Sequence, residues 1–232
     1  MNLELSVVIL TFNEQEDIRG CIDEAQSFSD DIHVIDSGST DDTVSLAEQC
    51  GAEVWHHPFS GFGEQRNWAI DHVPHQHQWV LHLDADERPT VAFVQELRQI
   101  LESDPDEAGF YVPSKLMLGN QWLRRSSGYP IYQVRLFHRE RLRFENYGHG
   151  QREVTKGLLG YMQEPYLHYA FSKGLEQWMR KHVGYAAKEA AESAVGRSSC
   201  LQDIRDCLHS DPIIRRRSLK RLSYLLPARS YL

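Results

Sequence analysis

Two aspartates separated by one residue follow an apolar run in the stretch LHLDADERPT, residues 81–90. The preceding run WVLHL is apolar enough for an inner strand, so Asp84 and Asp86 come where a buried strand ends. Two carboxylates that point the same way repel each other, and unpaired charge beside a core is costly, so such a pair usually holds a cation. Carboxylate oxygens favour Mg²⁺ or Mn²⁺ over zinc. We therefore expect Asp84 and Asp86 to bind one of these two ions.

Polar residues also end two earlier apolar runs. Thr11 closes the first run and is followed by Asn13 and Glu14, and Asp36 closes the second, IHVID. Ligands of an open parallel sheet bind at the carboxyl ends of its strands, so these side chains and the aspartate pair should converge on one crevice. Asp36 could accept a hydrogen bond from a base or a ribose hydroxyl, or it could be an ordinary turn acid before SGSTDD.

The segment after the first run also limits how phosphates can be held. A dinucleotide fold places GxGxxG there, so that helix N–H groups bind the pyrophosphate. The segment TFNEQE contains no glycine. A divalent ion that bridges the carboxylates to a diphosphate is the natural alternative, and it would make the diphosphate a better leaving group.

Two further features have competing interpretations. His72, His75 and His77 in HVPHQH could suggest a metal site, but they lie in a segment broken by proline, and we expect plain surface histidines. Trp122 has polar neighbours, so it could contact a ligand from a loop or pack in the core.

The elements that must position these residues alternate in the first half of the chain. Period-two and helical patterns predict strands at 3–11, 32–36, 52–57 and 78–86, and helices at 13–28, 43–50, 61–73 and 90–101. Asn13 is a plausible N-cap for the first helix. Strand–helix alternation at this spacing predicts an α/β fold with a parallel, doubly wound sheet. After residue 108 the runs 109–118 and 132–139 predict a mixed or antiparallel region, followed by a helix over 173–193.

Charge is distributed unevenly along the 232 residues. Residues 1–112 carry 23 acids and 4 bases, whereas residues 113–232 carry 10 acids and 21 bases, for a net charge of −8. The first half could hold cations and the second could meet phosphates or anionic lipid, or the two halves could simply be solvated faces of unlike sign. A nucleic-acid partner is not expected, since such proteins are basic overall.

Other features of the sequence indicate a cytoplasmic protein. No run approaches 18 apolar residues, and MNLELSVVIL lacks the basic segment of a signal peptide. The four cysteines show no CxxC spacing and are expected to be reduced thiols.

The last twenty residues contain six bases and no acid. Five of the bases alternate with leucines 219, 222, 225 and 226, namely Arg215, Arg216, Arg217, Lys220 and Arg221. This pattern predicts an interfacial amphipathic helix that would place the protein peripherally on the inner face of the cell membrane. The alternative is a basic helix packed on the acidic first half.

Four motifs together resemble a known family. The chain resembles the family 2 glycosyltransferases of GT-A fold in four motifs. In their order and at their spacing along the chain, these motifs are VVILTFNEQEDI, VIDSGSTDDT, GFGEQRNWAI and WVLHLDADE. The similarity is greatest to the non-processive branch that builds lipopolysaccharide core and exopolysaccharide. It implies a GT-A domain over 1–195, with a nucleotide-sugar half (1–108) and an acceptor half (109–195), before a tail at 196–232. It also implies nucleotide binding by Thr11, Asn13, Glu14, Asp36 and Arg66, with metal and diphosphate on Asp84 and Asp86.

The resemblance also implies a reaction. The family transfers a sugar from a nucleotide sugar, here with a UDP-sugar favoured, to a hydroxyl of a glycan or lipid-linked acceptor. The QxxRW signature of processive members is absent and QVRLF stands in its place, so we expect inverting transfer of a single sugar. The stretch YQVRLFHR resembles the segment that follows the acceptor region in the family, and we expect its Arg135, together with Trp122, to contact the acceptor.

The sequence offers two candidates for the catalytic base. Family members often carry a His-Glu dipeptide whose Glu is the base, whereas this chain has GHGQREV, with His149 and Glu153 apart. Either residue could act. Family members also usually continue beyond the equivalent of Leu232, as would be expected if this chain were part of a longer one.

Three other classes of protein fit less well. Phosphatases of the haloacid-dehalogenase type carry DxD on the first strand with Thr or Val two residues later, but here it follows the fourth strand and Arg88 takes that place. Sugar-nucleotide pyrophosphorylases need a glycine-rich basic loop near the N-terminus. A non-enzymatic receiver domain that binds Mg²⁺ needs an acid pair after its first strand, where this chain has Asn13 and Glu14.

Overall fold

A computed structural model describes residues 2–125, 129–147, 150–195 and 200–223. The chain forms two compact units, residues 1–185 and 186–232. The division falls inside helix α5 (Leu175–Val195) rather than after it.

The first unit contains the predicted strand–helix alternation followed by a strand-rich part. Its elements before α5 are β1 (Leu5–Thr11), α1 (Ile18–Gln26), β2 (Asp31–Asp36), α2 (Thr43–Gln49), β3 (Glu53–His56), α3 (Phe62–His72), β4 (Trp79–Asp84), β5 (Glu87–Arg88), α4 (Val91–Glu102), β6 (Gly109–Leu118), β7 (Gln121–Trp122), β8 (Ile131–His138), β9 (Arg143–Tyr147), β10 (Gly150–Val154), β11 (Leu159–Tyr161) and β12 (Tyr166–His168).

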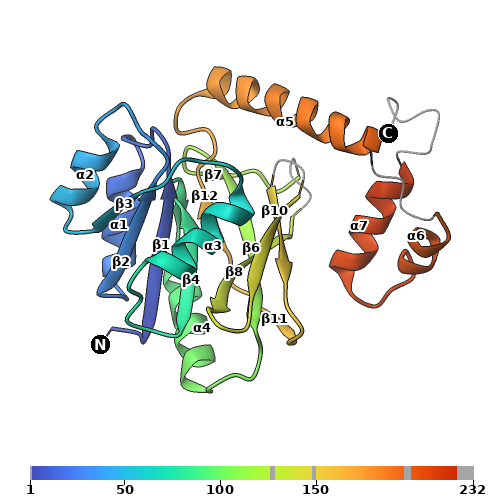
Figure 1. Cartoon of the computed structure of the whole chain (residues 1–232), viewed down its shortest axis with the longest axis horizontal. Helices are drawn as coiled ribbons and strands as arrows, with labels where there is room; N and C mark the ends of the chain where they lie inside the picture. Colours follow the sequence, from blue (N-terminus) through green and yellow to red (C-terminus); the bar gives the residue numbers. More distant parts are fainter. Residues whose placement is uncertain (1, 126–128, 148–149, 196–199, 224–232) are drawn as a thin grey trace. The chain divides into compact units, whose positions relative to one another are not determined.

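The main sheet has the strand order β3-β2-β1-β4-β8-β6-β12-β5 (Figure 1). The strands β3, β2, β1 and β4 are parallel, whereas β8 runs antiparallel to both of its neighbours. The prediction of an α/β fold with a mostly parallel sheet and a mixed second half is therefore confirmed.

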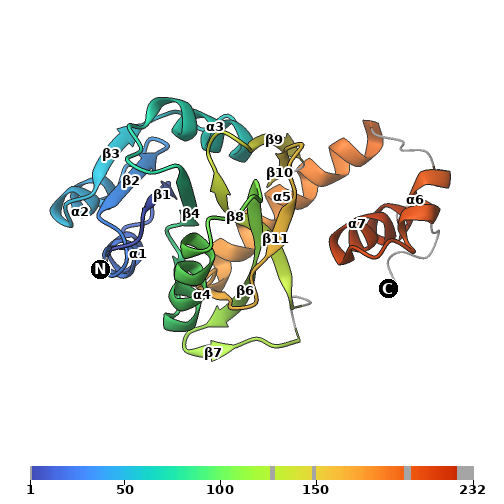
Figure 2. The ribbon, with the colours of Figure 1, turned by 90° about the horizontal axis from the view of Figure 1, so that it is seen from below.

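Both faces of the parallel half are covered by helices. Figure 2 shows α3 on one face of the sheet and α1 and α4 on the other. Every residue of β1 and β2 is buried, as expected of strands with helices on both sides. Each fully buried aliphatic side chain of such a core contributes about 1.5–3 kcal/mol to folding.

The register of the parallel strands brings the predicted site residues to one edge. Thr11 at the end of β1 is paired with Asp36 at the end of β2, and Leu10 is paired with Asp84 at the end of β4. Thr11 and Asp36 are therefore at one level, and Asp84 is at the level of the residue before Thr11. The three strands end at the same edge of the sheet, and convergence of these side chains on one crevice stays a prediction.

The first helix differs from the prediction in where it begins. It starts at Ile18 with Asp17 at the N-cap, so the predicted cap role of Asn13 is wrong. Asn13 adopts a left-handed conformation, with φ of 54°, that ends β1 in a turn. Its Oδ1 accepts a hydrogen bond from Thr40 N at 2.8 Å, and its N–H donates to Ser39 Oγ at 2.8 Å. The residue joins the loop after β1 to the loop after β2.

The second unit contains two short helices, α6 (Cys200–Asp206) and α7 (Pro212–Ser223). The predicted basic helix corresponds to α7, whereas Leu225 and Leu226 lie outside the described residues. Among the helices that the structure describes, none combines the length and apolar character needed to cross a bilayer.

Candidate active site

A buried network of two arginines and two acids lies directly beneath the carboxyl end of β4. Arg135 from β8 donates to Asp84 Oδ2 at 2.7 Å and also contacts the Glu87 carboxylate. Arg66 from α3 donates to Asp84 Oδ1 at 3.3 Å. Glu87 completes the network by accepting a hydrogen bond from the Asp84 N–H at 2.9 Å. All of these groups except Asp84 are almost fully buried.

The two guanidinium groups determine the charge state of Asp84. Burial alone would raise its pKa, but Arg135 and Arg66 outweigh this effect and hold the Asp84 pKa well below its usual value. Burial and the neighbouring Arg135 lower the Arg66 pKa to about 10, which still leaves Arg66 charged at neutral pH. Asp84 is therefore an ionised carboxylate whose charge is shared with two arginines.

We predict that Arg135→Met lowers the free energy of unfolding by about 3–5 kcal/mol, because it leaves buried carboxylates without their counter-charge. Urea unfolding of both proteins measures the difference. Arg143→Gln is the matched control, since Arg143 pairs with Asp71 on the surface at 3.3 Å and its loss should cost at most about 1 kcal/mol. Equal stabilities of the Arg135→Met and Arg143→Gln variants would contradict the structural role of Arg135.

The second aspartate of the pair has a different partner. Asp86 Oδ2 lies 3.3 Å from Nε2 of His168, the last residue of β12. Burial opposes the charge on this imidazole, but Asp86 outweighs it and raises the His168 pKa to about 9. With Asp86 as its partner and no metal ion bound, His168 is therefore protonated at neutral pH. The site thus offers a carboxylate and an imidazole side by side, close to Asp84.

Several buried polar atoms at the carboxyl edge of the sheet have no hydrogen-bond partner among the described residues. They include Nε and Nη1 of Arg66, Oγ1 of Thr11 and Oε2 of Glu14. Buried donors and acceptors are normally satisfied, so such atoms indicate where a ligand or water binds. Arg66 supplies N–H donors suited to phosphate oxygens.

Glu14 is held by a lysine from the segment before α5. Lys173 Nζ lies 2.5 Å from Glu14 Oε1. Burial raises the pKa of Glu14 to about 7, although Lys173 lowers it. Burial lowers the pKa of Lys181 on α5, but Tyr185, Asp86 and Glu14 outweigh this effect and raise it. The two lysines place positive charge beside the strand-end acids.

Asp36 is largely engaged by its own turn. Its Oδ2 accepts hydrogen bonds from the N–H groups of Gly38 at 2.9 Å and Ser39 at 3.0 Å, and its Oδ1 accepts from Ser39 Oγ at 2.5 Å. The contacts of Asp36 in the structure are therefore those of an ordinary turn acid. Contact with a nucleoside stays a prediction.

The two residues expected at the acceptor have very different surroundings. Two cations lie near the ring of Trp122, with Lys115 Nζ 4.7 Å and the Arg124 guanidinium carbon 4.9 Å from its centre. Its partly exposed ring suits a ligand contact. Arg135, in contrast, is buried against Asp84 and Tyr166, with its guanidinium 5.6 Å from the tyrosine ring. In this position Arg135 is suited to holding the carboxylates of Asp84 and Glu87 in place rather than to contacting an acceptor directly.

Of the two base candidates, the structure describes Glu153 only. Glu153 stands on β10 opposite Phe144, and its Oε1 accepts a hydrogen bond from Tyr111 Oη at 2.5 Å. His149 lies outside the described residues. The guanidinium of Arg152, the residue before Glu153, lies over the ring of Tyr147 at 3.2 Å.

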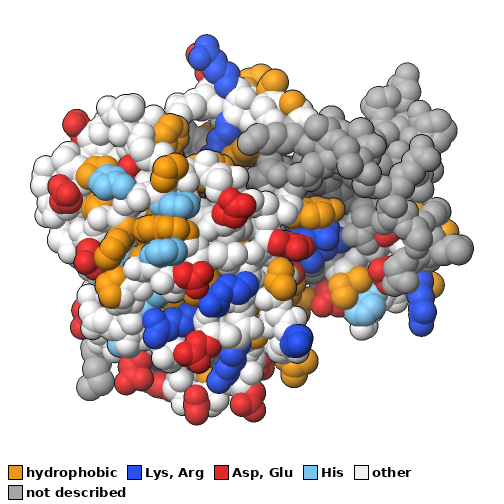
Figure 3. Space-filling model, viewed as in Figure 1, with side chains coloured by type: hydrophobic (Ala, Val, Ile, Leu, Met, Phe, Trp, Pro, Cys, Tyr) orange, Lys and Arg blue, Asp and Glu red, His pale blue; other side chains and the backbone are white. Residues whose placement is uncertain are grey.

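The histidine segment differs from the prediction in part. His72 is exposed and stacks on Trp68, with ring centres 4.9 Å apart, and histidine side chains lie beside apolar ones on this face in Figure 3. His75 is buried and its Nε2 lies 3.0 Å from the Ala69 carbonyl oxygen, so the prediction of a surface residue is wrong at this position. At His75 the segment that contains the proline packs against α3.

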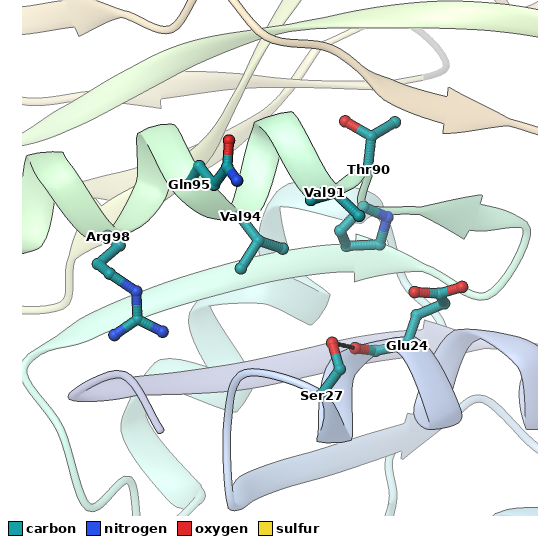
Figure 4. Close-up of a pocket in the computed structure, with 8 residues that line it drawn as sticks. Glu24, Ser27, Thr90, Val91, Val94, Gln95 and Arg98 are labelled. Carbon is teal, nitrogen blue, oxygen red and sulfur yellow. Dashed lines mark hydrogen bonds between the residues drawn. The ribbon is translucent and has the colours of Figure 1, made fainter. Parts of the chain in front are cut away.

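A separate hollow of about 250 Å³ lies between α1 and α4. Figure 4 shows its lining, with Glu24 and Ser27 on α1 and its end facing Val94 and Arg98 on α4. None of the strand-end acids lines it. This hollow is distinct from the candidate active site.

Sequence reasoning missed three residues of the site, which are Glu87, His168 and Lys173. Glu87 directly follows the aspartate pair and could have been included on that basis. His168 and Lys173 lie far along the chain from the residues they contact. No local pattern in EPYLHYAFSKG distinguishes them.

The open sheet, with acids and arginines at the carboxyl ends of its parallel strands, defines the class of α/β proteins with a GT-A fold. Residues 6–165 match the family described as Glycosyl transferase family 2. This match covers more than half of the chain, so the chain belongs to that family.

Similar proteins agree with this family. An uncharacterized glycosyltransferase of Rickettsia conorii is 32% identical over 115 residues, which cover 50% of this chain and 40% of the relative. The lipopolysaccharide core biosynthesis glycosyltransferase LpsC of Rhizobium meliloti is 26% identical over 159 residues, covering 66% and 55%. The chain thus spans about half the length of these relatives.

The glucosyl-3-phosphoglycerate synthase of Mycobacterium tuberculosis, solved with Mg²⁺ and UDP, has a similar fold. It is 21% identical and superposes with a TM-score of 0.51 over 78% of this chain and 79% of its own.

Proposed function

We propose that this chain transfers a single sugar from a nucleoside-diphosphate sugar, with a UDP-sugar favoured, to a hydroxyl of a glycan or lipid-linked acceptor. The observation that carries the proposal is that Asp86 and His168 pair beside Asp84, and that Asp84 in turn contacts Arg66, whose guanidinium has two buried nitrogens without partners among the described residues. Two metal ligands with N–H donors nearby suit a diphosphate that is bound through a metal ion.

The carboxylate oxygens of Asp84 and Asp86 fit Mg²⁺ or Mn²⁺, and Mn²⁺ also accepts an imidazole nitrogen such as that of His168. Asp86 and His168 offer an oxygen and a nitrogen at 3.3 Å, and the carboxylate of Asp84 is 32% exposed beside them. The bound ion would offset the charge that develops on the leaving diphosphate. Because Asp84 already shares its charge with two arginines, we infer that Asp86 and His168 are the stronger ligands. Metal binding would then displace the proton of His168.

The other polar groups have roles that follow from their positions. Arg66 would donate to phosphate oxygens with Nε and Nη1. Thr11 and Asp36 at the ends of β1 and β2, with Asn13 and Glu14 in the loop, would border the nucleoside. Arg135 would act as a positioning residue that fixes Asp84. Trp122 would offer its partly exposed ring to the acceptor sugar.

The acceptor hydroxyl must lose its proton as it attacks the anomeric carbon. We assign this role to Glu153, whose carboxylate is held by Tyr111 Oη, with His149 as the second candidate. A single displacement by this hydroxyl would invert the configuration at the anomeric carbon. A positioned general base contributes a factor of about 10² to 10⁴ in rate.

The acceptor and pathway are proposed from the relatives. LpsC of Rhizobium meliloti is named for lipopolysaccharide core biosynthesis, and its similarity extends over 66% of this chain. We propose a role in the synthesis of lipopolysaccharide core or another envelope polysaccharide. Within the chain, residues 1–108 would hold the nucleotide sugar, 109–195 the acceptor, and 196–232 would form a basic tail.

A screen of nucleotide-sugar hydrolysis tests the proposed function. The full chain is incubated with UDP-, GDP-, dTDP- and CMP-sugars, each with Mn²⁺, with Mg²⁺ and with EDTA. We expect release of the nucleotide from one UDP-sugar with metal and not with EDTA. No metal-dependent hydrolysis of any donor, by a chain that also fails to bind nucleotides, would refute the proposal.

The basic tail leads to a prediction about membranes. At about 1 kcal/mol per base near an anionic surface, the five bases at 215–217 and 220–221 should bring the chain to anionic vesicles. Co-sedimentation should pellet the full chain with anionic vesicles and leave it in solution with neutral ones. Chain 1–210 and the variant R215Q/R216Q/R217Q should both pellet less. Equal pelleting of all three proteins would reject the membrane role.

A further inference from the structure

A second group of metal-ligating side chains lies toward the amino end of the parallel strands. Asp31 and His33 stand on the first half of β2, and His75 lies in the segment between α3 and β4. One ligand atom of each lies within 4.8 Å of the others, and all three residues are buried. Strand residues rise about 3.3 Å each, so Asp31 is about 16 Å from Asp36 at the other end of β2. The group is therefore separate from the candidate active site.

The imidazole of His75 has one nitrogen occupied and one available. Its Nε2 lies 3.0 Å from the carbonyl oxygen of Ala69, which can only accept a hydrogen bond. Nε2 must therefore carry the proton, and Nδ1 keeps its lone pair in the neutral ring. Nδ1 is buried and has no hydrogen-bond partner among the described residues. Histidines that bind metals usually have this arrangement, with the remote N–H donated to a backbone carbonyl.

His33 has a carboxylate oxygen near each of its nitrogens. Nε2 lies 2.8 Å from Asp31 Oδ1, and Nδ1 lies 3.1 Å from Glu53 Oε2. Nδ1 is buried and makes no hydrogen bond of acceptable geometry to Glu53. A cation bound between Nε2 and Asp31 Oδ1 would leave the single N–H of the neutral imidazole on Nδ1, from which it could turn to Glu53. This carboxylate–histidine–metal sequence is common in metalloproteins.

The carboxylate of Asp31 is already oriented for such a role. Its Oδ2 accepts hydrogen bonds from Ser6 Oγ at 2.5 Å and from the Gln76 N–H at 2.9 Å. These contacts fix the group and leave Oδ1 directed at His33.

We propose that Asp31, His33 and His75 bind a divalent transition-metal ion, with zinc the preferred one. Two imidazoles and one carboxylate suit zinc, whereas Mg²⁺ prefers oxygen ligands alone. An adjacent hollow of about 380 Å³, lined in part by Asp31, His33, Glu53 and Gln76, provides room for a water molecule as the fourth ligand. The bound ion would tie the segment after α3 to the start of β2. It would stabilise the folded chain because the unfolded chain lacks the assembled site.

Cobalt spectroscopy on the full chain tests this proposal. The chain is freed of metal with a chelator and titrated with Co²⁺, whose visible absorption is intense in tetrahedral sites, and Zn²⁺ is then added to displace it. We expect one tetrahedral site per chain, and a higher melting temperature with Zn²⁺ than without it. His75→Ala and His33→Gln should each weaken binding by about 100-fold or more, since even outer contacts of metal ligands account for 10–100-fold.

Two further variants separate this site from other histidines and from the active site. His72→Ala removes the exposed histidine of the same segment and should leave the cobalt spectrum unchanged. Asp86→Ala should also retain the spectrum, so failure of the proposed function would not affect this result. Circular dichroism of each variant establishes that it is folded. If His75→Ala does not fold, His33→Gln and X-ray absorption of the zinc-bound wild type, with two imidazoles expected, decide the question.

Absence of a tetrahedral cobalt spectrum in the wild type would overturn the proposal. So would an unchanged spectrum in folded His33→Gln, or loss of the spectrum in Asp86→Ala alone. In each of those cases the three residues form only a buried hydrogen-bonded cluster.

Discussion

Asp86→Ala should abolish metal-dependent nucleotide binding while leaving the fold intact. Asp86 lies in the turn between β4 and β5, and its carboxylate is paired with His168 at 3.3 Å, so its removal leaves the buried arginine network unchanged. In the wild type, calorimetry should detect UDP or GDP binding with Mn²⁺ or Mg²⁺ and little binding in EDTA. The variant should bind at least about 100-fold more weakly in the presence of metal, which exceeds the effect of losing an outer contact.

The chain offers a matched control for this experiment. Asp23→Ala removes an exposed acid of α1, and its metal-dependent affinity should equal that of the wild type. In the Asp86→Ala variant the pKa of His168 should also fall from about 9 toward its ordinary value, which an NMR titration measures. Wild-type affinity for UDP or GDP that is the same in EDTA as in Mn²⁺ would refute the metal-bound diphosphate.

Glu153→Gln should lower kcat by about 10² to 10⁴ and leave the donor Kd nearly unchanged, because the amide cannot accept the proton of the attacking hydroxyl. The amide oxygen can still accept the hydrogen bond from Tyr111 Oη, so the local structure should be preserved. Steady-state kinetics and donor binding measured on the same protein separate the two quantities. His149→Ala should have a smaller effect.

Glu145→Gln on the same hairpin is the control, because Glu145 stands exposed on β9 opposite Arg152. Its kcat should equal that of the wild type. A Glu153→Gln enzyme with wild-type turnover would assign the base to another residue. A product that retains the anomeric configuration of the donor would contradict the single-displacement mechanism.

The parallel half of the sheet was predictable from local patterns. The apolar runs that end at Thr11, Asp36 and Asp84 became β1, β2 and β4, because alternation and burial depend on neighbouring residues alone. Parallel pairing of these strands then places their ends together whatever lies between them. The fold class and this edge of the site therefore follow from the sequence.

The contacts that complete the site were not predictable in this way. Arg135 and His168 approach Asp84 and Asp86 from β8 and β12, and the order of these strands depends on tertiary packing rather than on spacing. Arg135 was expected at the acceptor because of its motif, but its burial against Glu87 became visible only in three dimensions. The burial of His75 has the same origin, since a segment interrupted by proline gives no sign of where it folds.

The hydrogen bonds of Asn13 have a consequence for selectivity. They join two loops of the carboxyl edge, and the Glu14 N–H adds a further link to Thr43 Oγ1 at 2.7 Å. A donor would therefore meet one wall of its pocket in a fixed shape and would lose little free energy in ordering it. Such a wall discriminates by fit, so exchanging side chains at Ser39 or Thr40 should change which base is preferred. Adaptation to different sugars would then depend on parts of the site outside these two loops.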